Sequence, residues 1–159
     1  TGFKDPLMIE AVAVSGAAAI IMHMQGAPRT MQVSPVYTDV VSEVKAFLAE
    51  RAAALKAAGV KQIILDPGIG FGKTLGHNLE LIARLGELRA LGYPVLLGVS
   101  RKRFIETLSG GKPEERLSGT IAACVAGAAN GADIIRVHDV AECRKAMLVA
   151  DAIKAAAKK

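Results

Sequence analysis

Hydrophobic residues along this chain fall into two kinds of segment. Four short apolar runs, at residues 18–24, 63–65, 94–99 and 133–138, have the length and the flanking glycines or polar residues of buried strands. The longer segments between them carry an apolar residue every three or four positions, which is typical of amphipathic helices. Strands that alternate with helices in this way predict an α/β fold with parallel strands and right-handed crossovers.

Capping residues and glycines set the expected helix boundaries. Asp5, with Pro6 after it, predicts the start of a first helix that ends at Gly16. Asp39 opens a second helix, which ends at Gly59. Further helices are expected from Asn78 as a cap to Gly92, from residue 103 to 108, from residue 120 to 130, and from Asp139 onward, where Glu142 completes a capping box.

The second strand runs into a glycine-rich loop, in which Asp66 is followed by Gly68, Gly70 and Gly72. Glycines allow backbone conformations that bring N–H groups close to a ligand. A Walker A phosphate loop needs four residues between its first glycine and the Gly-Lys pair, and this loop has three. The dinucleotide fingerprint also fails, because its third glycine comes one position early. The loop is therefore either a plain tight turn or a site of another kind.

The composition fits one folded domain. The chain has 159 residues, of which 52% are hydrophobic, and its mean hydropathy is +0.35. Such a chain can bury a sizeable core, and no linker marks a second domain. Because it begins with Thr1 instead of Met, we expect it to be processed, engineered or part of a longer protein.

Charge and cysteine content narrow the class of partner. Twenty basic and 15 acidic residues give a net charge of +5, which suits anionic small molecules. The basic residues are scattered and only 4% of residues are aromatic, so we expect no nucleic-acid partner. The apolar stretch 11–22 is too short to span a membrane. Cys124 and Cys143 lack metal or redox spacing, which indicates reduced thiols and a cytoplasmic location.

Reactive side chains fall at the carboxyl ends of the predicted strands. They are His23, Asp66, Ser100, Arg136 and His138. Parallel α/β folds bind ligands at this edge. Arg136 and His138 are two residues apart and therefore project together. An arginine in a covered strand needs an acidic partner, an anionic ligand or solvent, so an ion pair is the structural alternative to a ligand site.

Other polar residues have simpler interpretations. His23 alternates with Met22 and Met24 and should point toward the covering helices, as a structural residue. His77 assists the start of a helix. The basic run at residues 100–103 precedes a helix, where positive charge is unfavourable, and an anionic or carbonyl-bearing ligand would relieve that conflict.

Four segments together resemble the dihydropteroate synthase family. They are MHMQGAPRTMQ at 22–32, LDPGIGFGKT at 65–74, GVSRK at 98–102 and RVHDV at 136–140. The resemblance runs from end to end and covers the carboxyl-terminal half of that family. It implies a TIM (β/α)8 barrel, in which residues 1–159 are the second half of one pterin-binding domain and supply only its last four βα units.

The resemblance also implies a reaction of folate biosynthesis. In this family p-aminobenzoate displaces pyrophosphate from 6-hydroxymethyl-7,8-dihydropterin pyrophosphate and forms 7,8-dihydropteroate. A cytoplasmic homodimer, inhibition by sulfonamides and Mg²⁺ as cofactor are implied too, with the Mg²⁺ ligand in the absent half and no metal ligand in this chain. Because the first four βα units are missing, we expect this chain alone to be inactive and to expose two unpaired strand edges.

Residue roles carry over by position in the matching segments. For the pterin, the resemblance implies that Asp66 accepts hydrogen bonds from the ring, that Lys102 binds it, and that Met22, Phe71 and Gly98 shape its slot.

For the leaving group, the resemblance implies that Arg136 and His138 hold the pyrophosphate and that Arg136 also lies against the pterin. Ser100 matches a residue near the carboxylate of p-aminobenzoate. Lys102, Arg136 and His138 are thus the expected catalytic residues.

Two other functions stay open on the sequence. One is a methyltetrahydrofolate corrinoid methyltransferase with a related barrel, against which the SRK and RVHD segments argue. The other is a non-catalytic module that binds anions or pterins on a flavodoxin-like sheet. Strand order separates the folds: sequential order with helices on one face indicates half a barrel, and a reversal with helices on both faces indicates a doubly wound sheet.

Overall fold

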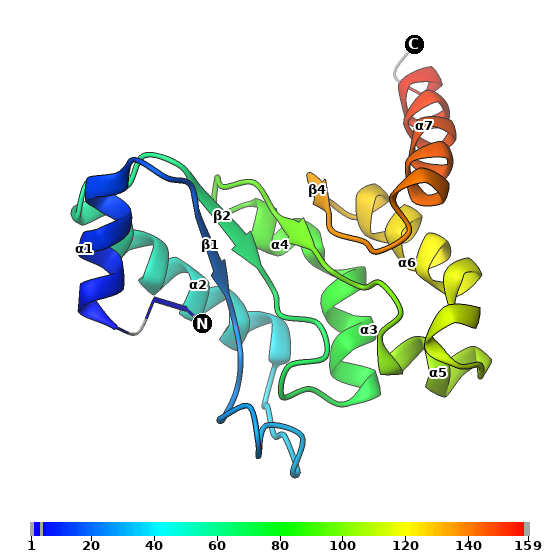
Figure 1. Ribbon diagram of the computed structural model, residues 1–159, viewed down its shortest axis with the longest axis horizontal. Coiled ribbons are helices and arrows are strands. Elements are labelled where there is room, and N and C mark those ends of the chain that lie inside the picture. Colours follow the sequence, from blue (N-terminus) through cyan, green and yellow to red (C-terminus); the bar gives the residue numbers. More distant parts are fainter. Residues whose placement is uncertain (1, 4, 158–159) are drawn as a thin grey trace.

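Helices and strands alternate along the chain in the computed structural model, which describes residues 2–3 and 5–157 (Figure 1). The four predicted strands are present. Three are shorter than the apolar runs that predicted them, and β2 extends one residue beyond its run, to Asp66. The elements are α1 Pro6–Ser15, β1 Ala19–Met22, α2 Val40–Ala57, β2 Ile63–Asp66, α3 Leu75–Ala83, α4 Leu85–Arg89, β3 Leu96–Leu97, α5 Arg103–Ser109, the 3-10 turn Pro113–Glu115, α6 Leu117–Ala129, β4 Ile134–Ile135 and α7 Val140–Ala156.

The strands lie side by side in the order of the sequence. β1 pairs with β2 and β3 pairs with β4, both in parallel. A parallel bridge between Leu65 and Val95, with a 2.9 Å hydrogen bond from the Leu65 amide to the Pro94 carbonyl, joins the two pairs. The order β1-β2-β3-β4 has no reversal, which is the arrangement expected of a barrel and not of a doubly wound sheet.

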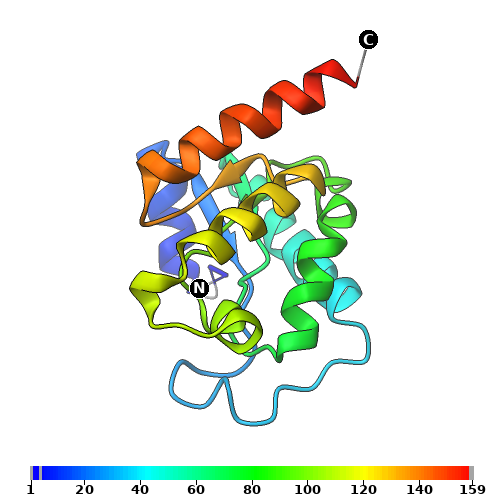
Figure 2. The same cartoon turned by 90° about the vertical axis from the view of Figure 1, so that its right-hand side faces the viewer.

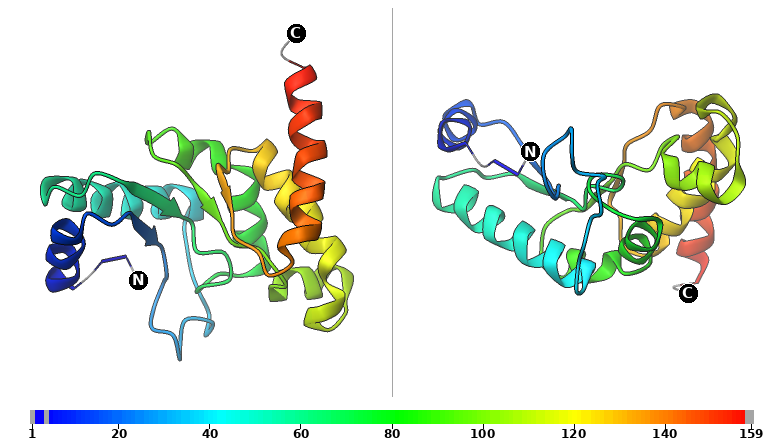
Figure 3. Two further views of the ribbon diagram at one scale, coloured as in Figure 1. Left: turned by 45° about the horizontal axis from the view of Figure 1, so that its top comes forward. Right: turned by 90° about the horizontal axis from the view of Figure 1, so that it is seen from below.

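One face of the strands packs against a layer of helices. Seen from below, α2, α3 and α6 follow the outside of the curved strand layer, and α1 lies beyond β1 (Figure 3). Ile21, Leu65 and Leu97 point into this interface and are fully buried. The apolar side of α2 meets them with Val41, Val44 and Leu48, also fully buried. The periodicity of three to four in the sequence thus predicted the buried side of α2 correctly.

The opposite face of the strands is apolar and is open at β1, whereas Leu96 of β3 on the same face is buried. Strand residues alternate between faces, so Ile20 and Ile64 share a face with Met22 and Asp66. On it Ile20 is 47% exposed, whereas its neighbours Ala19 and Ile21 are buried. Parallel strands are normally covered on both faces, so this side has the character of a core surface without its covering layer.

The predicted start of the third helix is wrong. This helix begins at Leu75 and not after Asn78, because Thr74 is its cap: its hydroxyl accepts a 3.2 Å hydrogen bond from the His77 amide. The His77 ring returns a contact to the Thr74 amide, which confirms that His77 assists the start. The helix also breaks at Arg84, giving α3 and α4.

The capping box predicted for α7 is also wrong. The helix does begin directly after Asp139, but the Asp139 side chain makes no cap hydrogen bond because its carboxylate is paired with Arg101. α7 packs against α6, and its C-terminal end projects beyond the other elements (Figures 1 and 2). In the part of the chain that the structure describes, no helix is both long and apolar enough to cross a membrane.

Candidate active site

Asp66 is the acidic group at the centre of the strand ends. One carboxylate oxygen accepts a 2.8 Å hydrogen bond from the Gly68 amide, which fixes the side chain at the start of the glycine loop. Burial raises the pKa of Asp66, and the charges of Lys102, Lys73 and Arg136 oppose that rise. Three cations from three segments of the chain therefore surround one partly desolvated carboxylate.

The glycine loop packs tightly against the segment that follows β1. Gly68 has a φ of +69°, and a Cβ at this position would lie 1.8 Å from the carbonyl oxygen of His23. Gly72 has a φ of +64°, and its Cβ would lie 2.6 Å from the carbonyl oxygen of Gln25. Only glycine permits this backbone conformation and this approach. The two glycines thus allow the backbone of the loop to lie close to the backbone after β1, where the loop passes Asp66.

Lys102 and Phe71 lie together beside this loop. The Lys102 ammonium donates a hydrogen bond to the Ile69 carbonyl and lies 4.9 Å from the centre of the Phe71 ring. Burial lowers the pKa of Lys102 to about 8, the negative charge of Asp66 opposes the fall, and Arg136 adds to it. The structure therefore brings three residues predicted for one ligand into one cluster: Asp66, Phe71 and Lys102.

Ser100 and His138 connect the ends of β3 and β4. The Ser100 hydroxyl accepts a 3.1 Å hydrogen bond from the His138 amide and lies 2.9 Å from Nδ1 of the His138 ring. A hydroxyl that accepts from the amide can donate its own proton to Nδ1. This contact fixes the orientation of the His138 ring through Nδ1 and leaves Nε2 available to a ligand.

Arg136 lies on the same strand end as His138. Both residues are exposed. Within residues 2–3 and 5–157, the Arg136 guanidinium forms no hydrogen bond or ion pair. The predicted alternative of a structural ion pair is therefore not found in this part of the chain, and the guanidinium faces solvent.

Met22 and Gly98 border the space beside Asp66. Met22 is the register partner of Asp66 and is half-buried. At Gly98 a Cβ would meet no heavy atom within 4 Å, so a glycine here leaves open space next to β3. His23 is buried and points toward α2, where its ring meets Phe47 edge-on at 5.0 Å, as its structural interpretation predicts.

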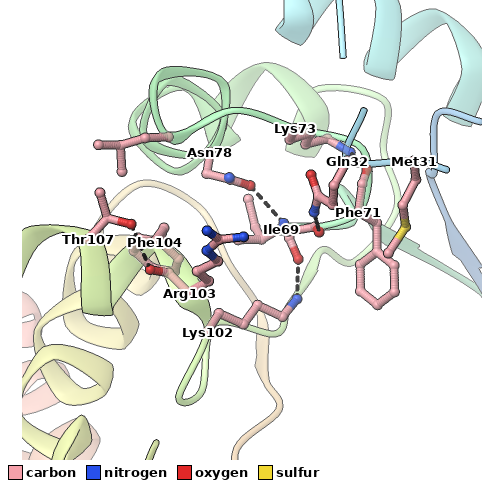
Figure 4. A pocket seen from close by; sticks show the side chains of 12 residues that line it. Met31, Gln32, Ile69, Phe71, Lys73, Asn78, Lys102, Arg103, Phe104 and Thr107 are labelled. Carbon is pink, nitrogen blue, oxygen red and sulfur yellow. Dashed lines mark hydrogen bonds between the residues drawn. The ribbon is translucent and has the colours of Figure 1, made fainter. Parts of the chain in front are cut away.

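A cavity of about 410 Å³ opens between the glycine loop and the start of α5. Figure 4 shows Phe71, Lys102 and Arg103 around it, with the Asn78 amide oxygen holding the Gly70 N–H at 2.7 Å. The cavity combines an aromatic ring with basic side chains. It thus suits a small aromatic or anionic ligand.

Two residues of this region escaped the sequence analysis. Lys73 is 4% exposed and makes three hydrogen bonds beside the glycine loop. In the sequence it stands out only as the lysine of the Gly-Lys pair, in a loop that does not match the Walker A motif. Arg101 pairs with Asp139, a contact between distant positions that no local pattern reveals.

The side chains that the structure describes do not form a metal site. In residues 2–3 and 5–157 there is no group of three or more His, Cys, Asp or Glu side chains that could hold a metal ion.

A known protein family matches the part of the chain that carries these residues. The sequence profile of the family described as pterin binding enzyme matches residues 1–138, which include every strand end described above. The chain belongs to the pterin binding enzyme family.

Curated relatives of this family are dihydropteroate synthases. The chain is 47% identical to that of Escherichia coli K12 over 151 residues, covering 94% of this chain and 54% of the relative. It is 50% identical to that of Neisseria meningitidis serogroup B over 139 residues, covering 84% and 49%. The chain thus spans about half the length of these pterin binding enzymes.

Solved structures of pterin binding enzymes superpose closely. Thermus thermophilus dihydropteroate synthase in complex with 6HMPPP matches with a TM-score of 0.94 at 47% identity, over 97% of this chain and 62% of that chain. The same enzyme in complex with 4-aminobenzoate also gives 0.94. A Yersinia pestis dihydropteroate synthase with a sulfonamide drug complex gives 0.94 at 41% identity, over 98% and 57%.

Proposed function

We propose that this chain is the second half of a dihydropteroate synthase, supplying the last four βα units of a TIM barrel as one domain over residues 1–159. Three observations support this. The chain spans about half of its relatives, its strands follow one another in sequential parallel order, and their inner face is apolar and is open at β1. The other half of the barrel would cover Ile20 and Ile64 and pair with the strand edges.

The proposed reaction joins the two molecules bound in the Thermus complexes. The amine of p-aminobenzoate attacks the methylene carbon of 6-hydroxymethyl-7,8-dihydropterin pyrophosphate, the C–O bond breaks, and pyrophosphate leaves with the bonding electrons. The amine nitrogen then loses one proton to water or to the released pyrophosphate. The product is 7,8-dihydropteroate, an intermediate of folate biosynthesis. An aniline nitrogen is already nucleophilic, so no residue is assigned as general base or covalent nucleophile.

The observation that carries the proposal is the carboxylate of Asp66 among three cations at the strand ends. A pterin ring presents adjacent N–H donors, which a fixed carboxylate accepts. Lys102 supplies an N–H donor from the segment that follows β3, and its contact with Phe71 keeps the two side chains beside the pterin ring. Met22, Phe71 and the open space at Gly98 form the walls of the slot.

Departure of pyrophosphate requires positive charge and donors on the leaving oxygens. Arg136, which is one of the three cations around Asp66, and His138 project together at the end of β4. Interactions that strengthen as charge develops lower the barrier more than interactions with the bound substrate do. Ser100 orients the His138 ring through Nδ1, which leaves Nε2–H to donate to a phosphate oxygen. In the same proposal Ser100 also lies near the aminobenzoate carboxylate.

Three further features belong to the proposal. The exposed apolar residues Leu148, Val149 and Ile153 on α7 suit the interface of a homodimer. Two free, buried cysteines, Cys124 and Cys143, suit the reducing cytoplasm. Mg²⁺ would be held by residues outside this chain together with the diphosphate.

A chimaera tests the proposed function. This chain replaces the matching half of the Escherichia coli dihydropteroate synthase, and both the chimaera and the separate chain are purified free of host enzyme. We expect dihydropteroate from the chimaera and none from the separate chain. In the chimaera, Lys102→Ala should weaken pterin binding, and Arg136→Ala should lower kcat by about a hundredfold.

Two results would contradict the proposal. Wild-type kinetics in both Lys102→Ala and Arg136→Ala would contradict the assignment of Lys102 to pterin binding and of Arg136 to pyrophosphate release. Binding of pterin by a folded chimaera that forms no product would favour the non-catalytic pterin-binding module instead.

A further inference from the structure

Lys73 is a buried cationic side chain that the proposed reaction does not use. It follows the glycine loop and is 4% exposed, and lysine is almost never buried without partners. Its three partners come from two segments of the chain. Nζ lies 3.0 Å from Nδ1 of His23, and it donates to the carbonyl oxygens of Gly68 at 3.0 Å and Phe71 at 3.1 Å.

These contacts tie the loop to the strand beside it. Gly68 and Phe71 are the two ends of one turn, closed by a 3.1 Å hydrogen bond from the Phe71 amide to the Gly68 carbonyl. His23 is the residue after β1 and is itself packed against Phe47. Lys73 therefore joins both ends of the turn to the end of β1 through one nitrogen atom.

An amino group is what this arrangement needs. As an ammonium it donates to all three partners, and as a neutral amine it donates to the two carbonyls and accepts from a His23 ring protonated on Nδ1, whereas a methionine has no donor. Burial lowers the pKa of Lys73 to about 7, the carboxylate of Asp66 opposes the fall, and Lys102 adds to it. His23, Asp66 and Lys102 are thus the titratable groups that face Lys73, and the centre of the Tyr37 ring lies 6.1 Å from that of the His23 ring.

We propose that Lys73 is a positioning residue for pterin recognition, which holds the turn from Gly68 to Phe71 so that Asp66 and Phe71 face the same ligand. The proposal rests on the proposed function, because it takes Asp66 and Phe71 as pterin contacts. Asp66 is fixed by the Gly68 amide, and Phe71 is the other end of the turn that Lys73 holds. Lys73 itself touches no substrate in this proposal; it acts through the loop.

The proposal differs from a purely structural role in what it predicts. A structural lysine affects stability and every kinetic constant together. A positioning lysine affects the ligand that the loop contacts, and it affects the loop itself before any ligand binds. The two roles are therefore separated by the Kd for the pterin pyrophosphate, the KM for p-aminobenzoate and the rate of amide hydrogen exchange in the loop.

The test uses the complete barrel, for example the chimaera described above, with Lys73→Met as the variant of nearly equal length. Lys61→Met, at an exposed lysine before β2, is the matched control. We expect Lys73→Met to raise the Kd for the pterin pyrophosphate by about tenfold and the KM for p-aminobenzoate at saturating pterin by less than about threefold. Hydrogen exchange of the amides at residues 68–71 should accelerate without ligand, and Lys61→Met should leave all three values unchanged.

Chemical rescue covers the case in which Lys73→Met folds poorly. Lys73→Ala leaves a space of the shape of an alkyl ammonium, so millimolar propylamine should restore pterin affinity and slow the exchange at residues 68–71, and propanol should restore neither. Unchanged pterin affinity and unchanged loop exchange in Lys73→Met would overturn the proposal. So would a loss of affinity in Lys73→Ala that propylamine does not restore.

The same experiment separates this proposal from the proposed function. Asp66→Asn should abolish pterin binding if the proposed site is right. If Asp66→Asn binds pterin like the wild type, the proposed function fails, while faster loop exchange in Lys73→Met still shows that Lys73 holds the loop.

Discussion

The guanidinium of Arg101 and the carboxylate of Asp139 form a two-point ion pair, with Nε and Oδ2 3.0 Å apart, between the loop after β3 and the start of α7. Arg101 has a φ of +57°, which is unusual for a residue with a side chain. Its amide donates to Thr120 at 3.0 Å, and its carbonyl accepts from Arg116 at 2.9 Å. Arg101 is thus fixed through its side chain, its amide and its carbonyl.

Asp139→Asn tests what the ion pair does. Arg101 lowers the pKa of Asp139, so the carboxylate is ionised at neutral pH, and an amide of the same shape removes the charge. Because Asp139 follows His138, we expect kcat in the complete barrel to fall by about tenfold through looser placement of the imidazole. Glu142→Gln, an exposed residue in the first turn of α7, is the control and should keep its kcat. Steady-state kinetics of both variants test this expectation, and a kcat of Asp139→Asn equal to that of Glu142→Gln would contradict it.

Gly98→Ala tests the slot beside β3. The new methyl group meets no protein atom within 4 Å, so the free energy of unfolding should change by less than about 0.5 kcal/mol. The same methyl group enters the proposed pterin slot, so the KM for the pterin pyrophosphate should rise by about tenfold or more. Urea denaturation and steady-state kinetics of one preparation give both numbers. A pterin KM equal to that of the wild type would place the pterin elsewhere.

Gly68→Ala and Gly16→Ala separate backbone strain from steric clash. Both glycines have a φ of +69°, but a Cβ at Gly68 would lie 1.8 Å from the His23 carbonyl and a Cβ at Gly16 would meet nothing within 4 Å. Gly16→Ala should therefore destabilise by about 1 kcal/mol, the cost of the left-handed conformation alone. Gly68→Ala should cost about 3 kcal/mol or more, because the loop must also move away from β1. Equal losses of unfolding free energy in chemical denaturation would show that the loop can move away from the His23 carbonyl at little cost.

The pH dependence of pterin binding should follow Lys102. Its pKa is about 8, so the ammonium loses its proton as the pH rises through that value, and the charge proposed to bind the pterin is lost. We expect the Kd for the pterin pyrophosphate to increase between pH 7 and pH 9, as titration calorimetry can measure. Lys102→Arg keeps its charge over this range and should give a flatter profile, even if its affinity is lower. A wild-type Kd that is constant from pH 7 to pH 9 would contradict the assignment.

Local patterns predicted most of the fold. Asp5 and Asp39 cap their helices where the sequence places them, since each carboxylate accepts from amides two or three residues on. The prediction failed at Asn78, because two residues compete for one helix start and Thr74 provides the cap. Asn78 instead holds the glycine loop from inside the helix, which spacing alone does not reveal.

The sequence singles out the candidate site residues that follow strands, and it does not single out those that depend on distant contacts. Asp66, Arg136 and His138 stand out because a polar residue closes an apolar run. Lys73 and Arg101 acquire their roles from partners at His23 and Asp139, many positions away along the chain. Lysine and arginine at such positions look like ordinary surface residues until the fold brings their partners to them.

The open inner face, with Ile20 at 47% exposure, bears on the order in which the protein is made. In the proposed barrel the ribosome releases these four units last, so their apolar face meets a partner that has already been synthesised. A protein cut or translated from an internal start would lose that partner. Its inner face would then be available to chaperones, proteases or other copies of itself.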